Sequence, residues 1–150
     1  MQKITPFLWY NGKAGEAAKF YCSIFKNSKI IKENRNGKKV LGVTFRINGQ
    51  ELIAFNGGPM FKFTPAISLF VHCKTQKEVD YYWEKLSKGG KKIQCGWLQD
   101  KYGLSWQIIP DILGDLLGDK NPAKADRVYQ AMMKMTKIDI KALKSAYNQK

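Results

Sequence analysis

The fold of this chain is decided by residues 95–110, which read Cys-Gly-Trp-Leu-Gln-Asp-Lys-Tyr-Gly-Leu-Ser-Trp-Gln-Ile-Ile-Pro. Two short apolar runs, 97–98 and 106–109, flank a polar segment that extends from Asp100 to Gly103. A glycine adopts positive φ without steric cost, and an aspartate side chain can accept hydrogen bonds from the backbone of its own loop. The spacing therefore predicts a β-hairpin whose turn is built by Asp100 and Gly103.

The sequence before this hairpin repeats one pattern at a constant offset of 62 residues. In each copy a short apolar strand precedes a helix whose apolar residues recur at i, i+3, i+4 and i+7. The strands are Pro6–Tyr10 and Ser68–His72, and the helical positions are Ala17, Phe20, Tyr21 and Ile24, then Val79, Tyr82, Trp83 and Leu86. The Asn48-Gly49 pair predicts a further hairpin in the first copy. We therefore expect two βαβββ units, at about residues 3–59 and 66–110.

Capping residues mark where helices begin. Thr75 and Glu78 have the spacing of a capping box, in which the hydroxyl and the carboxylate each satisfy a backbone N–H at the start of a helix. Asn121-Pro122 combines an N-cap residue with proline at the first helical position, and Asp139 is a second N-cap candidate. We therefore expect a C-terminal helical extension over residues 111–150.

The length and composition indicate one globular domain spanning residues 1–150, because 44% of the residues are hydrophobic and 13% are aromatic. No apolar run approaches the ~20 residues of a membrane span, and the N-terminus lacks the apolar region of a signal peptide. We therefore expect a cytoplasmic location and no membrane partner. Cys22, Cys73 and Cys95 are widely spaced, which favours reduced, buried thiols over a disulfide framework.

The net charge of +14 raises nucleic acid as a partner. Of the 26 cationic residues only Arg35, Arg46 and Arg127 are arginines, and the lysines are scattered through nearly every expected element. Proteins that read nucleic acids cluster their charge and use arginine for bidentate contacts. We therefore expect no specific nucleic-acid partner. The alternative, a nucleic-acid or anion binder, would show binding that depends steeply on salt.

Several short motifs, together with the paired βαβββ units, resemble the PhnB-like group of the vicinal oxygen chelate superfamily, which includes glyoxalase, bleomycin-resistance and dioxygenase proteins. The motifs are Ile4–Trp9, Ala17–Tyr21, Phe55–Pro59, Ile67–Val71, Val79–Trp83 and Cys95–Leu98. Proteins of this group often carry the name 3-demethylubiquinone-9 3-methyltransferase. The resemblance implies an α+β glyoxalase/bleomycin-resistance fold, in which the two units form a curved mixed sheet followed by C-terminal helices. It also implies a ligand site in the concavity of the sheet, and a homodimer.

The metal enzymes of this superfamily take ligands from the first and last strands of each unit. The resemblance implies that Gln107 stands where those enzymes have a metal-binding glutamate, and a neutral amide is a poor ligand. The matching positions on the other strands lie within 5–7, 55–56 and 66–68, which contain no His, Glu or Asp. A catalytic divalent ion needs about three such ligands, so we expect no metal and no other cofactor. The lone His72 has no partner in the motif and is interpreted as a surface or core histidine.

We expect the function to be metal-free binding of a small molecule of unknown identity. Strand alternation from Gln107 places Ser105 on the same face of the sheet, and Trp97 and Cys95 face the concavity on the neighbouring strand. Aromatic walls with a few amides suit an apolar or aromatic ligand. The predicted pocket residues are Phe7, Trp9, Asn56, Cys95, Trp97, Ser105 and Gln107.

Two alternatives to a binding pocket remain open. The aromatic residues could simply fill the interior of the sheet, or the protein could be an enzyme of isomerase, lyase or dioxygenase type, which would need a metal or a reactive side chain. The methyltransferase name is not supported by the residues. A doubly wound methyltransferase needs a glycine-rich loop after its first strand and parallel βα units, whereas the predicted hairpins force antiparallel pairing. No catalytic residue is predicted.

Overall fold

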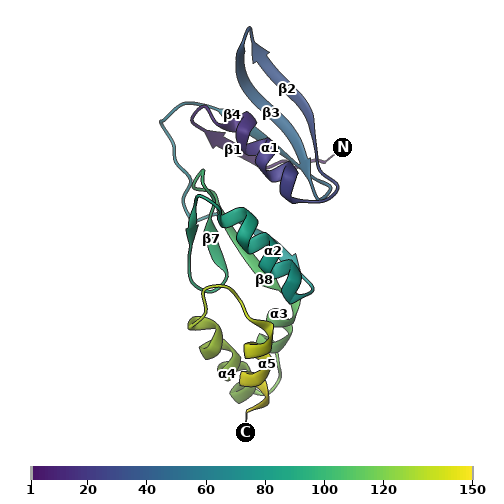
Figure 1. Cartoon of the computed structure of the whole chain (residues 1–150), viewed down its shortest axis with the longest axis vertical. Helices are drawn as coiled ribbons and strands as arrows, with labels where there is room; N and C mark the ends of the chain where they lie inside the picture. Colours follow the sequence, from purple (N-terminus) through teal and green to yellow (C-terminus); the bar gives the residue numbers. More distant parts are fainter. Residues whose placement is uncertain (1, 150) are drawn as a thin grey trace. The chain divides into compact units, whose positions relative to one another are not determined.

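The computed structural model describes residues 2–149 (Figure 1), and the chain divides into a first unit that ends at Phe63 and a second that begins at Thr64. Each unit contains a four-stranded mixed sheet with one helix packed against it, and the second unit continues into three further helices. The predicted α+β fold class with C-terminal helices is confirmed. Among the described residues, no helix is both long enough and apolar enough to cross a membrane.

The first unit has its strands in the order β1-β4-β3-β2, with β1 parallel to β4 and the other neighbours antiparallel. Its elements are β1 (Phe7–Tyr10), α1 (Ala14–Ile24), β2 (Lys29–Asn36), β3 (Lys39–Ile47) and β4 (Gln50–Asn56). The helix buries Ala17, Tyr21 and Ile24 and packs against β3 and β4, as its apolar periodicity predicts. Asn48 and Gly49 both have positive φ, 48° and 80°, which gives the tight turn expected of Asn-Gly.

Strand β1 starts at Phe7 and not at Pro6, where the sequence repeat places it. Proline has no N–H to donate to a ladder, and here only its carbonyl takes part, by accepting a hydrogen bond from the N–H of Ile53 at 3.0 Å. The first strand is therefore one residue shorter than predicted because one of its expected residues lacks a donor.

The second unit repeats the strand order as β5-β8-β7-β6, again with one parallel pair, β5 and β8. Its elements are β5 (Ser68–Cys73), α2 (Gln76–Ser87), β6 (Lys91–Lys92), β7 (Trp97–Gln99) and β8 (Ser105–Pro110). The offset of 62 holds through the helices, since α1 begins at Ala14 and α2 at Gln76. It ends there because β6 and β7 have 2 and 3 residues, whereas β2 and β3 have 8 and 9.

The capping box at the start of α2 forms as predicted, with one shift. The hydroxyl of Thr75 accepts a hydrogen bond from the N–H of Glu78 at 3.2 Å. The Glu78 carboxylate reaches back to the N–H of Lys74 at 3.0 Å, one residue before the usual target. Both bonds satisfy backbone donors where the chain enters the helix.

The hairpin between β7 and β8 is organised by Asp100, whose side chain is only 2% exposed. One carboxylate oxygen, Oδ1, accepts hydrogen bonds from the backbone N–H groups of Tyr102 at 2.8 Å and Leu104 at 3.1 Å. The other, Oδ2, accepts from the indole N–H of Trp106 at 2.9 Å. Gly103 has a φ of 89°, as the turn prediction requires. A single side chain thus holds the loop and orients the first large core residue of β8.

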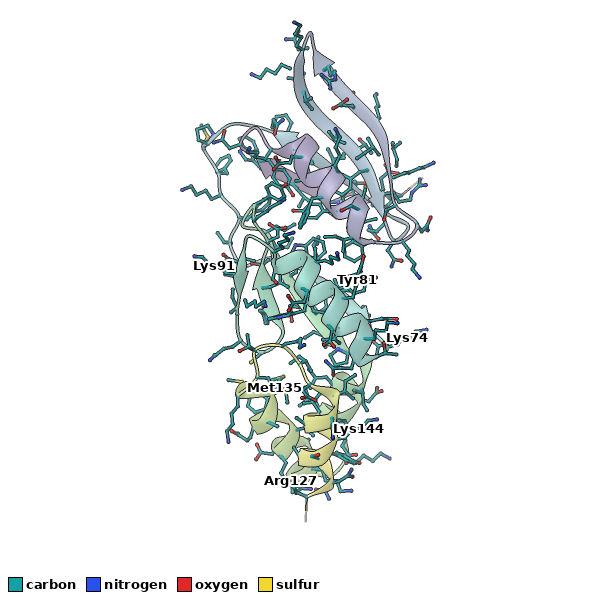
Figure 2. The ribbon with its side chains drawn as sticks, in the orientation of Figure 1. Lys74, Tyr81, Lys91, Arg127, Met135 and Lys144 are labelled. Carbon is teal, nitrogen blue, oxygen red and sulfur yellow. The ribbon has the colours of Figure 1, made fainter. Side chains whose placement is uncertain are left out.

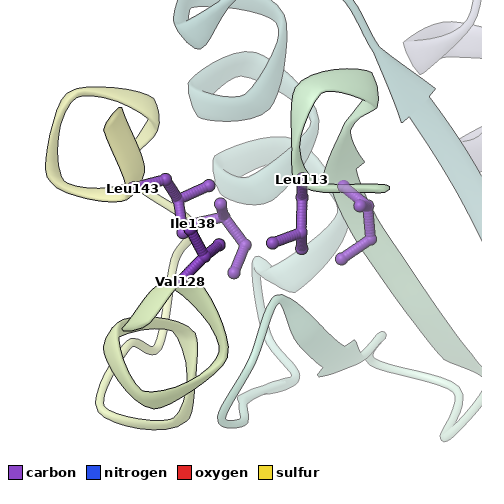
Figure 3. Packing of buried hydrophobic residues seen from close by; sticks show 5 residues of the cluster. Leu113, Val128, Ile138 and Leu143 are labelled. Atoms are coloured by element: carbon purple, nitrogen blue, oxygen red, sulfur yellow. The ribbon is translucent and has the colours of Figure 1, made fainter. Parts of the chain in front are cut away.

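The C-terminal extension consists of α3 (Asp111–Leu117), α4 (Pro122–Met133) and α5 (Ile140–Asn148). Both predicted N-caps are confirmed, because Asn121 accepts from the N–H groups of Ala123 and Lys124 and Asp139 accepts from that of Ala142. The three helices enclose a small core, shown in Figure 3, that also includes the end of β8; its buried residues are Ile109, Leu113, Val128, Ile138 and Leu143.

Polar contacts also hold the extension together and join it to the sheet. Arg127 on α4, labelled in Figure 2, donates to the carbonyls of Ala146 at 3.0 Å and Tyr147 at 3.1 Å in the last turn of α5. The N–H groups of Cys95 and Gly96 donate to carbonyls in the segment between α4 and α5, at 2.9 and 2.8 Å. The extension is therefore joined to the segment that precedes β7 by backbone hydrogen bonds as well as by side-chain packing.

None of the three cysteines is joined in a disulfide. Cys73 is buried, whereas Cys22 and Cys95 are only half-buried, so the expectation of buried thiols applies to one of the three. Burial raises the pKa of the Cys73 thiol to about 12, and the nearby negative charges of Glu78 and Asp111 add to the shift. This thiol is protonated at neutral pH.

Candidate functional site

A cavity of 380 Å³ lies in the second unit. This volume is within the usual range for small-molecule sites. Strands β5, β7 and β8, the segment before β7, and helices α3 and α4 contribute the lining residues, which are Phe70, His72, Cys95, Trp97, Gln107, Ile109, Pro110, Asp111, Leu113, Gly114, Leu117 and Met132. A larger depression of 740 Å³ on α4 and α5 is lined mostly by polar and charged residues, so a larger share of its lining is polar.

Strand register assembles one wall of the cavity. Gln107 on β8 pairs with Phe70 on β5 and with Trp97 on β7, so these three residues form a row across the sheet. Residues in register on neighbouring strands project from the same face. The alternate residues Leu98, Trp106 and Ile108 are buried on the face that α2 covers.

The amide of Gln107 is held in one orientation. Its Nε2 donates a hydrogen bond to the hydroxyl of Ser68 at 3.0 Å. Within the described part of the chain, no donor is hydrogen-bonded to its Oε1. The wall therefore combines two aromatic rings with one carbonyl-type acceptor that a ligand can use.

The predicted site residues of the second unit divide into two groups. Cys95, Trp97 and Gln107 line the cavity. Ser105 is 1% exposed and does not line it, and over residues 2–149 its hydroxyl has no hydrogen-bond partner. Ser105 differs from the other three because the alternation of side chains along a strand assigns a residue to a face of the sheet. It does not predict which other residues cover that position.

The predicted residues of the first unit do not line this cavity. Phe7 is exposed and its ring packs on Phe55, with centroids 5.2 Å apart, while the indole of Trp9 donates to the carbonyl of Gly58 at 3.0 Å. Asn56 accepts from the N–H of Ala14 at 2.8 Å. Its amide nitrogen also donates to the carbonyl of Val40 at 3.1 Å. Asn56 therefore has a structural role at the start of α1, since both ends of its amide are engaged.

A polar pair at the cavity, His72 and Asp111, was not predicted from the sequence. Nδ1 of His72 lies 3.2 Å from Oδ1 of Asp111, and both residues line the cavity. His72 also packs against Phe70, with ring centroids 4.8 Å apart. The two residues are 39 positions apart, but the parallel pairing of β5 with β8 brings Cys73 opposite Pro110, directly beside them. If the strand that contains His72 had been predicted to pair in parallel with the strand that ends at Pro110, the contact between His72 and Asp111 could have been inferred.

Cys95, a predicted site residue, is half-buried and lines the cavity. Its thiol donates weakly to the carbonyl of Met132 at 3.7 Å and lies 3.8 Å from the sulfur of Met133. Its backbone has a φ of 60°, which is uncommon for a residue with a side chain. This conformation allows the N–H groups of Cys95 and Gly96 to reach the α4–α5 segment.

The residues present do not fit a divalent metal ion. Among residues 2–149, no group of three or more His, Cys, Asp or Glu side chains is close enough to share one. Gln107, which the sequence resemblance equates with a metal-binding glutamate, is a neutral amide already hydrogen-bonded to Ser68. His72 and Asp111 are a pair and would supply at most two ligands.

The family model described as 3-demethylubiquinone-9 3-methyltransferase matches residues 2–109. The structure of a PhnB protein from Bacillus cereus, which carries the same family name, is 39% identical with a TM-score of 0.69; the match covers 73% of this chain and 99% of that one. A Pseudomonas aeruginosa protein is 17% identical with a TM-score of 0.60, over 73% of this chain and 98% of that one.

A fosfomycin resistance protein from Listeria monocytogenes, in complex with Mn(II) and sulfate, is 18% identical with a TM-score of 0.50, over 71% of this chain and 88% of that one. At this identity the likeness shows a shared fold alone, as it does for the Pseudomonas protein. No curated protein matches the chain. Because the family model covers most of the sequence and the Bacillus protein is matched over nearly its full length, the chain belongs to the PhnB family, named 3-demethylubiquinone-9 3-methyltransferase.

Proposed function

We propose that this protein binds a small apolar or aromatic molecule in the cavity of its second unit, without a metal ion and without chemical turnover. The observation that carries the proposal is the row Phe70–Gln107–Trp97, which places one oriented amide between two aromatic rings on the cavity wall. Such a row can sandwich or edge-pack a flat apolar molecule while Gln107 Oε1 accepts one hydrogen bond from it.

Replacing Gln107 can distinguish a role in ligand binding from a role in stabilising the fold. Replacing Gln107 with leucine keeps a similar volume, so the free energy of unfolding should change by less than about 1.5 kcal/mol. A ligand that donates to the amide would lose that bond, which should weaken binding by about 1–3 kcal/mol. Binding and stability therefore respond differently to the same change.

The experiment is a thermal-shift screen of apolar and aromatic metabolites and antibiotics against the wild-type protein, repeated on Gln107→Leu and Trp97→Ala. Gln99→Leu is the matched control, because Gln99 has the same side chain on the neighbouring strand but does not line the cavity. We expect a stabilising ligand whose effect is reduced by the two cavity variants and kept by the control. A ligand that stabilises all four proteins equally would place the site elsewhere and contradict the proposal.

An enzymatic role is the second candidate, and the observation that favours it is the His72–Asp111 pair, which lines the same cavity as the Cys95 thiol. A histidine oriented by a carboxylate can serve as a general base. Stoichiometric zinc, iron, nickel or manganese in the purified protein by elemental analysis, or conversion of the bound ligand, would favour an isomerase, lyase or dioxygenase and reject pure binding.

The family name does not extend the proposal to methyl transfer. Over residues 2–149 each sheet has one parallel pair, and the hairpins around Asn48-Gly49 and Asp100–Gly103 are antiparallel. The crevice of a doubly wound methyltransferase forms between adjacent parallel βα units, which need a glycine-rich loop at the first helix. The chain from β1 to α1 has Gly12 in this connection, without the repeated glycines that such a loop requires.

The proposal includes a homodimer in the cytoplasm with no specific nucleic-acid partner. Light scattering should give twice the mass of the chain. Any DNA binding should be insensitive to sequence and lost at about 0.2 M salt, because dispersed lysines contact phosphates without reading bases. A persistent, sequence-selective gel shift at that salt would contradict this part.

A further inference from the structure

The C-terminal extension, described here from residue 111 to residue 149, lies outside the part of the chain that matches the family. The family model ends at residue 109. The match to the Bacillus cereus protein uses 73% of this chain and 99% of that one, so almost nothing of that protein is left to correspond to the extension. The extension is therefore an addition to the shared fold.

The extension supplies a wall of the cavity. Leu113, Gly114 and Leu117 from α3 and Met132 from α4 line it together with the row on the sheet. The wall is firmly held, because Leu113 belongs to the buried core of the three helices and Met132 packs against that core. Within the second unit, the added helices supply the part of the cavity lining that the sheet does not provide.

The extension also supplies the polar end of the cavity. Asp111 is the first residue of α3, and its carboxylate only accepts hydrogen bonds, so Nδ1 of His72 must carry the hydrogen of their contact. In a neutral imidazole the other nitrogen, Nε2, is then an acceptor. Among the residues described, no donor is hydrogen-bonded to it. Asp111 thus acts as a positioning residue that holds the His72 ring by Nδ1 and leaves Nε2 as an acceptor.

We propose that the C-terminal extension is the ligand-selecting part of this protein, and that it selects a hydroxylated aromatic molecule. The apolar wall limits the size of the aromatic body, and the Asp111-oriented imidazole accepts the hydrogen of the hydroxyl group. This inference rests on the proposed binding function and goes further by naming the ligand class and the element that determines it.

The test uses two probes of the same shape, 2-naphthol and 2-methylnaphthalene, with affinities measured by titration calorimetry. The size arm uses Gly114→Leu. A Cβ built at Gly114 meets no atom within 4 Å, so the added side chain occupies the cavity without displacing the helix. The matched control is Gly15→Leu in α1, which also lies in a helix and has only Glu33 Oε1 at 4.0 Å as a neighbour.

We expect Gly114→Leu to lower the affinity for both probes by about tenfold or more, which corresponds to a loss of roughly 1.4 kcal/mol of binding free energy. Gly15→Leu should leave both affinities unchanged. Folding of Gly114→Leu is checked by its unfolding curve, and leucine has a higher helix propensity than glycine. Leu117→Trp fills the same cavity from the next turn and provides a second variant for the size arm.

The chemistry arm uses His72→Phe, which keeps a ring beside Phe70 but removes the acceptor. We expect the ratio of the naphthol affinity to the methylnaphthalene affinity to fall by about two- to tenfold, because one hydrogen bond contributes about 0.5–1.5 kcal/mol and the His72 side chain is 73% exposed. Asp111→Ala should lower the same ratio by a smaller factor, because the imidazole remains but is no longer oriented. Asp115→Ala, an exposed carboxylate on the same helix, should leave the ratio unchanged.

Two results would overturn the inference while the proposed function stands. One is an unchanged affinity for both probes in both cavity-filling variants, and the other is an unchanged affinity ratio in His72→Phe. A wild-type protein that binds neither probe also rejects the hydroxylated aromatic class. In that case a ligand from the thermal-shift screen that responds to Gln107→Leu keeps the binding function, and the absence of any such ligand rejects both.

Discussion

The buried carboxylate of Asp100 gives the sharpest test of how the deciding hairpin is held. Its two oxygens accept hydrogen bonds from the N–H groups of Tyr102 and Leu104 and from the indole of Trp106. Hydrogen bonds to a charged group contribute about 1.5–3 kcal/mol each, but these three share the desolvation cost of one carboxylate. We therefore expect Asp100→Ala to lower the free energy of unfolding by about 3–5 kcal/mol, and not by the sum of three full bonds.

Asp100→Asn separates the loop bonds from the indole bond. An asparagine keeps an oxygen at Oδ1 for the two backbone donors, but it places an N–H group opposite the indole N–H of Trp106. We therefore expect it to cost about half as much as alanine, roughly 1.5–3 kcal/mol. In a Trp106→Phe background the cost of Asp100→Asn should fall below about 1 kcal/mol, because the opposing donor has been removed.

Urea unfolding followed by circular dichroism measures these free energies. Asp115→Ala, an exposed carboxylate on α3, is the control and should stay within about 0.5 kcal/mol of wild type. Equal costs of Asp100→Asn in the wild-type and Trp106→Phe backgrounds would refute the reasoning, since the indole bond would then contribute nothing. A cost of Asp100→Ala below about 1 kcal/mol would refute the role of the carboxylate altogether.

Three further predictions concern the second unit. Thr75→Ala removes the N-cap of α2, and thermal unfolding should show a loss of about 1 kcal/mol; an unchanged Tm would mean that the hydroxyl bond is not needed. Gly96→Ala places a Cβ 2.8 Å from Ile109 Cδ1 at a φ of 80°, so it should cost at least about 2 kcal/mol and expose the C-terminal extension to limited proteolysis, unlike Gly114→Ala. Because of the Cys73 thiol, the free energy of unfolding should fall as the pH rises from 9.0 toward about 12. In the unfolded chain the thiol loses its proton near its ordinary pKa of 9.0, whereas in the folded protein it keeps the proton until its pKa of about 12. Cys73→Ala should flatten that part of the stability–pH curve relative to wild type, and an identical slope would contradict the raised pKa.

The order and type of the elements were predictable because they depend on local signals. Apolar periodicity located α1 and α2, Asn48-Gly49 marked one hairpin, and capping residues such as Asp139 marked the helix starts. The misplaced start of β1 has a local cause too, the missing N–H of Pro6. Strand lengths were less predictable, since β2 is exposed along its whole length and no apolar alternation marks its end at Asn36.

The candidate site was predictable only in part, because a cavity depends on contacts between distant segments. Alternation from Gln107 leads to Trp97 on the same hairpin, but Phe70 joins the row only through parallel pairing across 37 residues. The His72–Asp111 pair depends on the same pairing. Asn56 depends on a different kind of contact, because the backbone at Ala14 and Val40 engages both ends of its amide. Interpreting such a residue requires knowing which backbone groups need a partner.

The most direct measurement of the central claim is an NMR titration of ¹⁵N-labelled protein with the strongest stabilising ligand from the thermal-shift screen. The chain has four tryptophans, so four indole N–H resonances can be followed together with the side-chain amide of Gln107. We expect the indole of Trp97 and the amide of Gln107 to shift in a saturable way, because both line the cavity, while Trp9 and Trp83 stay unchanged. Saturable shifts confined to Trp9, or none at Trp97 and Gln107 at saturating ligand, would contradict the claim that the cavity of the second unit is the binding site.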